Sequence, residues 1–208
     1  MRILRTVLHQ LLLRRLYEEG IEVKYGMKLT EIEETKDSVK ITFEDGTTQI
    51  CDLLVGADGI RSAVRSLHVD PEHEPEYTGI SVLYGLVPTC TLSEPIYFST
   101  NFASIMSRRG LFATGFCDPQ HETIYWFVSH EVPLRNPEGW STQDKESEKV
   151  KAEVRERMKD IKVPLMEDIL NKSPWFRFYP VFKLLPQGKW YTERTVLVGD
   201  AAHGTSAL

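Results

Sequence analysis

Two short apolar runs that each end in glycine and aspartate constrain the fold of this chain more than any other feature. They are residues 52–59, DLLVGADG, and residues 195–203, TVLVGDAAH. A nearly continuous apolar run of this kind is typical of a strand buried on both faces of an α/β sheet. Small residues after each run open a helical pattern, which covers residues 60–67 in the first case. The sequence therefore predicts two strand–turn–helix segments.

Turns of this composition suit a ligand that carries phosphate or sugar groups. Glycine at the carboxyl end of a strand lets the backbone come close to a ligand, and the N–H groups of the following helix favour a pyrophosphate. Aspartate at such a point accepts hydrogen bonds from ribose or ribityl hydroxyls. A plain strand-to-helix turn with a helix-capping aspartate explains either segment equally well. Taken alone, each turn leaves both interpretations open.

The first part of the chain predicts a helix and a small meander. Apolar residues at i, i+3, i+4 and i+7 precede Gly20, which favours a helix that ends there. These residues are Leu4, Val7, Leu8, Leu11, Leu12 and Leu16. Alternating patterns over residues 21–25, 29–35 and 39–43, with turn-forming pairs at 36–37 and 45–46, then predict antiparallel strands.

The character of the sequence changes near residue 69. Prolines separate β-rich stretches, and helical periodicity returns only at residues 144–161. The predicted strands cover residues 79–87, 102–108, 111–117, 123–129 and 177–185. We interpret residues 69–190 as a second, mostly antiparallel domain inserted into a first domain made of residues 1–68 and 191–208.

Composition excludes several classes of protein. The chain has 25 Lys+Arg against 30 Asp+Glu, a net charge of −5, and lacks the basic excess of nucleic-acid binders. No apolar run approaches the roughly 20 residues of a membrane span, and the first residues show no signal-peptide pattern. The cysteines Cys51, Cys90 and Cys117 form no CxxC pair, so we expect neither a disulfide scaffold nor a metal site. The expected location is cytoplasmic.

Taken together, the motifs resemble one known family. Residues 52–65, DLLVGADGIRSAVR, resemble the Asp-Gly fingerprint of FAD-dependent aromatic monooxygenases of class A, the family of p-hydroxybenzoate and salicylate hydroxylases. Residues 196–203, VLVGDAAH, resemble the Gly-Asp motif of these enzymes, and residues 5–12, RTVLHQLL, resemble their Arg-x-x-Leu-His helix. Trp190 stands where the family often carries a tryptophan. The resemblance extends over the whole chain.

The resemblance implies an α/β fold, a partial Rossmann-like FAD-binding domain with an inserted antiparallel β-sheet substrate domain of α+β type. It implies FAD as cofactor, NADPH or NADH as reductant, and O₂ as oxidant. The reaction would hydroxylate or epoxidise a small aromatic or secondary-metabolite molecule. Flavin carries this chemistry, while the protein positions the reactants and excludes water.

Site residues follow from the resemblance, position by position. Arg5 would reach the flavin cofactor from its helix. Asp58 and Gly59 would lie near the FAD pyrophosphate and the path of the nicotinamide cofactor. Asp200 would hydrogen-bond the ribityl or ribose portion of FAD, with Gly199 before it and the Ala201 backbone beside it. The resemblance assigns no catalytic side chain.

Two features of the family are missing from the sequence. No Gly-x-Gly-x-x-Gly motif is present, and Ala207 occupies the position of the proline that usually follows the Gly-Asp motif. We therefore expect a chain truncated at both ends that binds FAD weakly or not at all. A ubiquinone-pathway hydroxylase or a geranylgeranyl-reductase-like enzyme would share the same turns. A non-enzymatic remnant whose exposed sheet edges bind a partner chain is the alternative of a different class.

Other chemistry-bearing residues have plainer interpretations beside their functional ones. His203 is expected to be a motif residue rather than a general base, and Cys117 with His121 lacks the second ligand pair of a zinc site. Arg61 and Arg65 would attract a phosphate of NADPH or pair with surface carboxylates. Several aromatic residues would line an apolar pocket or pack in the core. They are Tyr125, Trp126, Phe127, Trp175, Phe176, Phe178 and Tyr179.

Overall fold

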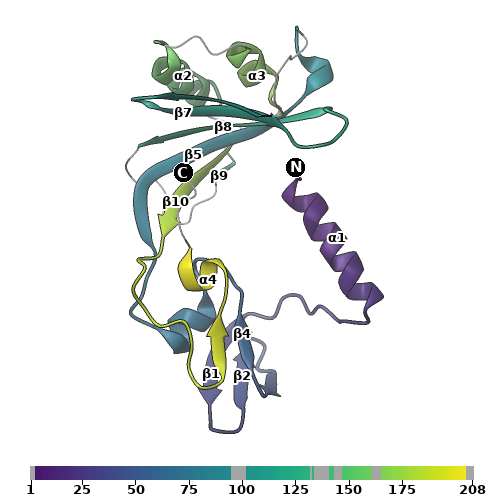
Figure 1. Ribbon diagram of the computed structural model, residues 1–208, viewed down its shortest axis with the longest axis vertical. Helices are drawn as coiled ribbons and strands as arrows, with labels where there is room; N and C mark the ends of the chain where they lie inside the picture. The colour runs from purple at the N-terminus through teal and green to yellow at the C-terminus, as the bar shows by residue number, and fades with distance from the viewer. Residues whose placement is uncertain are drawn as a thin grey trace. The chain divides into compact units, whose positions relative to one another are not determined.

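The computed structural model describes residues 3–94, 102–131, 133, 141–142, 147–160 and 165–204. The chain divides into two compact units, each with its own strands and its own apolar core (Figure 1). The first unit comprises Met1–Ile21 and Gly79–Pro180, and the second comprises Glu22–Thr78 and Val181–Leu208. The fold class is the mixed helix-and-sheet arrangement that the sequence predicts. The predicted domain boundaries, at residues 68/69 and 190/191, stay predictions.

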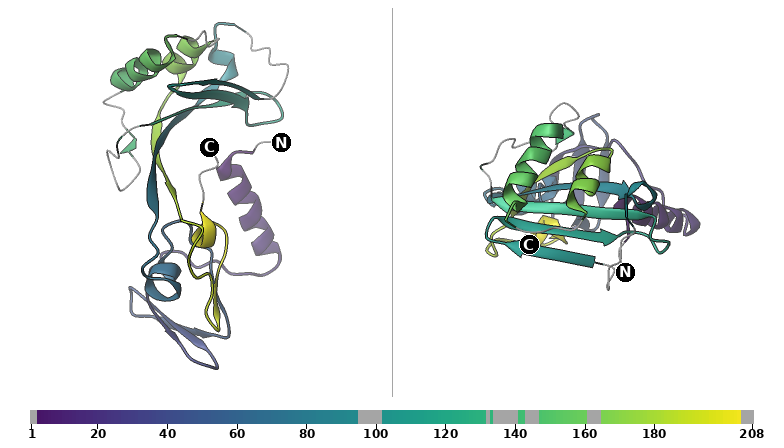
Figure 2. Two further views of the ribbon diagram at one scale, coloured as in Figure 1. Left: turned by 60° about the vertical axis from the view of Figure 1, so that its left-hand side comes forward. Right: turned by 90° about the horizontal axis from the view of Figure 1, so that it is seen from above.

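The first unit contains most of a six-stranded sheet in the order β6-β7-β8-β5-β10-β9. Its strands are β5 (Glu76–Pro88), β6 (Phe102–Ser107), β7 (Gly110–Phe116), β8 (Thr123–Glu131), β9 (Ser141–Thr142) and β10 (Arg177–Lys183). Helices α2 (Ser147–Met158) and α3 (Met166–Lys172) lie on one face of this sheet (Figures 1 and 2). The five predicted strands and the helical stretch after residue 144 are confirmed, with shifted ends.

The helix-covered face of the sheet centres on Trp126, which is fully buried. Its indole Nε1 donates to Ser173 Oγ at 2.7 Å, and that hydroxyl donates to the Ile169 carbonyl at 2.7 Å. Gly85 lies opposite Trp126 across β5 and β8, where a Cβ atom would come within 2.9 Å of the indole. The absence of a side chain at Gly85 therefore leaves room for the indole ring of Trp126 on the neighbouring strand.

Helix α1 (Arg5–Glu18) confirms the predicted N-terminal helix, and none of its residues is buried. The strand predicted at residues 21–25 is wrong. This segment runs irregularly between Gly20 and Gly26, whose φ angles are +70° and +72°. Its apolar side chains stay exposed, so strand pairing here would gain no stability from a buried face. Among the described residues, no helix is long and apolar enough to cross a membrane.

The second unit contains the predicted meander, with strands β1 (Leu29–Glu34), β2 (Val39–Phe43) and β3 (Thr48–Cys51) in antiparallel order. Turn chemistry sets both hairpins, since Thr35 and Asp45 bond the backbone of their own turns. Two further strands, β4 (Leu54–Gly56) and β11 (Thr195–Leu197), pair in parallel. They correspond to the two apolar runs of the sequence.

The prediction that the first run is buried on both faces is wrong for β4. Leu53 and Val55 are 56% and 51% exposed, because the described sheet contains β11 and β4 alone. The covered side is tightly packed. A Cβ atom at Gly56 would come within 2.8 Å of Leu197 and 2.9 Å of Val64. The helix predicted over residues 60–67 is confirmed with shifted ends: residues 63–69 are helical, and the last five of them, Arg65–Val69, form a π-helical turn.

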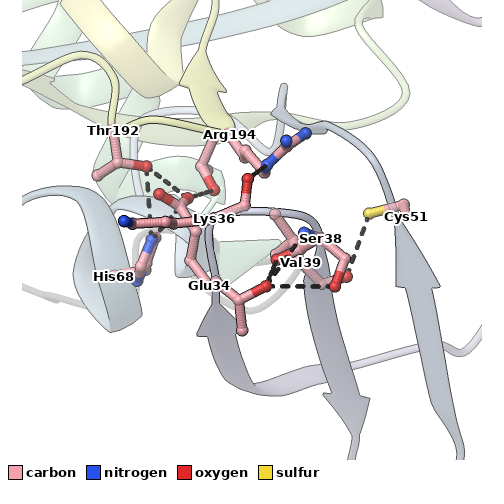
Figure 3. A network of polar contacts seen from close by, with 10 residues as sticks. Glu34, Lys36, Ser38, Val39, Cys51, His68, Thr192 and Arg194 are labelled. Carbon is pink, nitrogen blue, oxygen red and sulfur yellow. Dashed lines mark hydrogen bonds and ion pairs between the residues drawn. The ribbon is translucent and has the colours of Figure 1, made fainter.

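One carboxylate joins three separate segments of the second unit (Figure 3). Glu34 Oε2, at the end of β1, accepts hydrogen bonds from Thr192 Oγ1 at 2.6 Å and Thr195 Oγ1 at 2.7 Å. His68 Nε2 lies 3.1 Å from the same oxygen. Burial raises the pKa of Glu34, but these hydrogen bonds outweigh it and lower the pKa to about 2. The ionised carboxylate therefore stabilises the fold.

We expect Ser173→Ala to lower the free energy of unfolding by about 1–3 kcal/mol, since the Trp126 N–H would be buried without an acceptor. Urea unfolding followed by circular dichroism measures this loss. Ser104→Ala, at an exposed position of β6, is the matched control and should change stability little. Equal losses in the two variants would contradict the role given to Ser173.

We expect Glu34→Gln to cost about 1–3 kcal/mol of unfolding free energy at pH 7. The pKa of Glu34 is lowered from 4.5 to about 2 in the folded chain, so its contribution is complete above pH 4.5 and falls as the pH drops towards 2. The difference in unfolding free energy between the parent and Glu34→Gln should decrease as the pH falls from 4.5 towards 2. Glu33→Gln, which removes an exposed partner of Lys40, is the control and should cost far less.

Candidate functional site

The two glycine–aspartate turns lie side by side in the second unit. β4 and β11 run parallel with Gly56 opposite Leu197, so both strands end at the same edge of the sheet. Helix α4 (Asp200–His203) begins directly after β11 (Figure 1). The structure thus brings together Asp58 and Gly59 with Gly199, Asp200 and Ala201. Open α/β sheets bind ligands at this position, outside the carboxyl ends of their strands.

Both glycines are needed for backbone conformation. Gly59 has a φ of +83° and Gly199 a φ of +58°, values that side chains disfavour. Apart from its chain neighbours, a Cβ atom built on either one would meet none of the described residues within 4 Å. The space beside both turns is therefore open, and a ligand is able to approach the backbone closely at these two points.

The two aspartates of the turns, Asp58 and Asp200, have different roles. Asp58 Oδ2 accepts the backbone N–H groups of Ala63 at 2.6 Å and Val64 at 3.2 Å, so Asp58 caps the helical turn that follows it. Asp200 is exposed at the first position of α4, and no hydrogen bond to its carboxylate occurs within the described part of the chain. Asp200 is thus the acceptor that stays open to a ligand.

A buried guanidinium connects the two turns. Arg65 is 2% exposed, and its Nη2 donates to the Ile60 carbonyl at 2.6 Å. Its Nη1 donates to the Ala201 carbonyl at 2.8 Å, and Nε donates to the His73 carbonyl at 3.0 Å. Burial lowers the pKa of Arg65, and the nearby charges of Asp58 and Asp70 oppose that effect.

The expectation that Arg65 meets a phosphate or a surface carboxylate is therefore wrong, because its donors are used by backbone carbonyls. The i,i+4 spacing of Arg61 and Arg65 suggested two equivalent arginines, and no pattern in the sequence distinguishes the buried one. Arg61 is exposed and lies over the Phe182 ring, 4.8 Å from its centroid. Its proposed attraction for NADPH stays a prediction.

Arg5 lies on α1, in the first unit, and its contact with a cofactor stays a prediction. His203, at the end of α4, has its ring 5.6 Å from that of Trp190. This contact places the two family-motif residues together in the second unit.

The Cys117 and His121 segment is held by its own hairpin. The Cys117 thiol donates to the Thr123 carbonyl, His121 stacks on Phe116 at 4.1 Å, and the Asp118 carboxylate accepts two backbone N–H groups. Over the described ranges, no cluster of three or more potential metal ligands occurs.

The aromatic residues of the first unit separate into two sets. Trp126 and Phe176 belong to the helix-covered core. Tyr125 and Phe127, their neighbours in sequence, point to the other face because side chains alternate along β8. There Tyr125 lies 5.9 Å from Tyr84 and 5.7 Å from Phe127. Burial and the nearby Tyr84 raise the pKa of Tyr125 to about 12, so its phenol stays protonated at neutral pH.

Comparison with known proteins identifies the family. The family model described as FAD binding domain matches residues 3–207. The putative FAD-dependent monooxygenase YetM of Bacillus subtilis is 28% identical over 97% of this chain and 51% of its own length. The 3-amino-4-hydroxybenzoate 2-monooxygenase PtmB3 of Streptomyces platensis is 29% identical over 96% of this chain and 47% of its own.

A solved structure shows the same fold. HpxO of Klebsiella pneumoniae, complexed with FAD and uric acid, matches with a TM-score of 0.77 and 20% identity. The match covers 97% of this chain and 48% of that chain. The chain spans about half the length of the relatives it matches. On the family match over residues 3–207, the chain belongs to the FAD-binding domain family of FAD-dependent aromatic monooxygenases.

Proposed function

We propose that the chain is part of an FAD-dependent monooxygenase in which the second unit binds FAD through its two glycine–aspartate turns. The observation that carries this proposal is the parallel pairing of β4 with β11, which sets Gly59 and Gly199 at one sheet edge. The space beside both glycines is open, so the residues present fit a ligand whose phosphates or sugar approach the backbone.

The chain's own residues have distinct tasks in this proposal. Asp200 accepts a hydrogen bond from a ribityl or ribose hydroxyl, and the first N–H groups of α4 have no partner inside the helix. Asp58 fixes the other turn by capping it. Bound FAD supplies the redox chemistry, in which NADPH or NADH and O₂ convert a C–H bond of the substrate into C–OH and release water. We place this activity in the cytoplasm.

The substrate that we propose is a small flat ring. PtmB3 is named for a hydroxybenzoate, and HpxO was solved with uric acid, so both relatives handle planar molecules. The first unit offers a cluster of aromatic side chains, tilted against one another, on the sheet face that its helices leave uncovered. Both sequence relatives are named as monooxygenases, which does not favour a partner-binding remnant or a geranylgeranyl-reductase-like enzyme.

The test of cofactor binding is a titration of FAD with the purified chain, followed by quenching of flavin fluorescence. The sequence alone predicts weak FAD binding or none, but with both turns at one sheet edge we expect saturable binding instead. Asp200→Asn should weaken it about tenfold, because a charge-assisted hydrogen bond is lost. Asp37→Asn, in a meander turn of the same unit, should leave the affinity unchanged. An absence of saturable binding in the parent chain would refute the proposal.

Activity is tested by oxidation of NADPH in the presence of FAD and 3-amino-4-hydroxybenzoate. We expect this aromatic acid to accelerate NADPH oxidation and to yield a product heavier by one oxygen atom, detected by mass spectrometry. The aliphatic cyclohexanecarboxylate is the control, since it keeps the carboxylate but lacks a flat ring. Equal rates with the two acids would contradict the proposed substrate class.

A further inference from the structure

We infer that Arg65 is a positioning residue for the cofactor: it sets the spacing of the two glycine–aspartate turns, so that FAD affinity depends on it without contact. This inference rests on the proposed function of the second unit. Arg65 is 2% exposed, so its guanidinium lies behind the turns rather than on the surface that a ligand meets.

The geometry connects the two motifs through a single side chain. Ile60, whose carbonyl accepts from Nη2, directly follows Gly59, and Ala201, whose carbonyl accepts from Nη1, directly follows Asp200. The two acceptors come from distant parts of the sequence, since Ile60 lies 5 residues before Arg65 and Ala201 lies 136 residues after it. One rigid planar group therefore holds a carbonyl from each turn at 2.6 Å and 2.8 Å.

Arg65 is itself held at its backbone and at its guanidinium. Ser62, which is fully buried, accepts the Arg65 backbone N–H on its Oγ at 2.9 Å. Nε donates to the His73 carbonyl at 3.0 Å. Asp58 caps the same helical turn through Ala63 and Val64, so the motif aspartate and Arg65 belong to one hydrogen-bonded frame.

The choice of partners favours positioning over simple stabilisation. A buried cation is usually paired with a carboxylate, and an uncompensated one is costly. Here all three described side-chain bonds of Arg65 go to neutral backbone carbonyls, and Asp58 and Asp70 act on it only through their charge. The position of a backbone carbonyl depends on the backbone conformation around it. Hydrogen bonds that hold the Ile60 and Ala201 carbonyls therefore also hold the conformation of the two turns. A site held in its binding conformation before the ligand arrives binds more tightly.

The experiment compares three variants by FAD titration at a temperature where circular dichroism shows each one folded. Arg65→Met removes all three bonds, and we expect FAD to bind at least about tenfold more weakly. Arg65→Lys keeps the charge but cannot span three carbonyls, so its affinity should lie between those of Arg65→Met and the parent. Val69→Ala, a buried apolar truncation in the same π-helical turn, is the matched control for lost stability.

Backbone hydrogen exchange gives a readout that does not need FAD. The N–H groups of Ala202 and His203 bond the Gly199 carbonyl, and we expect both to exchange faster in Arg65→Met but not in Val69→Ala. If Arg65→Met binds FAD within about twofold of the parent, or if Val69→Ala weakens binding as much, the inference is wrong. If the parent chain itself does not bind FAD, that result contradicts the proposed function, and it is distinguishable from a failure of the Arg65 inference alone.

Discussion

The parallel pairing of β4 with β11 is the interaction on which the second unit depends. The two strands come from distant parts of the sequence, and each is only three residues long. Such a short pair has few hydrogen bonds of its own, so its register must be enforced from outside. Gly56 does this on one side, because the absence of a side chain lets Leu197 and Val64 close over it. Small residues here serve packing as much as ligand access.

Two charged groups hold the segment from β11 to α4. Thr195, the first residue of β11, donates to the Glu34 carboxylate, while the Ala201 carbonyl, in α4, accepts from the Arg65 guanidinium. The Glu34 carboxylate accepts from two hydroxyl groups and lies beside His68, and the Arg65 guanidinium donates to backbone carbonyls. Each charge therefore acts through directional hydrogen bonds, which specify position more sharply than a salt bridge would. The edge that carries both turns lies between these two anchors.

Local patterns in the sequence predicted most of the elements, and long-range contacts explain what was missed. The strands that became β1, β2, β7 and β8 follow from alternation and turn residues, which act within a few positions. The strand predicted at residues 21–25 also alternates, but nothing packs against it, and only tertiary structure shows that. The motif residues Asp58, Gly59, Gly199 and Asp200 were found because chemistry and spacing are local there. The roles of Arg65 and Glu34 were not predicted, because each of these residues depends on a partner more than 130 residues away in the sequence.

The contact between Glu34 and Thr195 also bears on the order in which the chain folds. These residues are 161 positions apart, and the strands of the first unit's sheet lie between them in the sequence. During synthesis the earlier part of a chain leaves the ribosome first and begins to fold. The meander is therefore made early, and the Glu34 carboxylate has no hydroxyl partners until Thr192 and Thr195 emerge. The unit that carries the two turns is completed after the sheet that interrupts it.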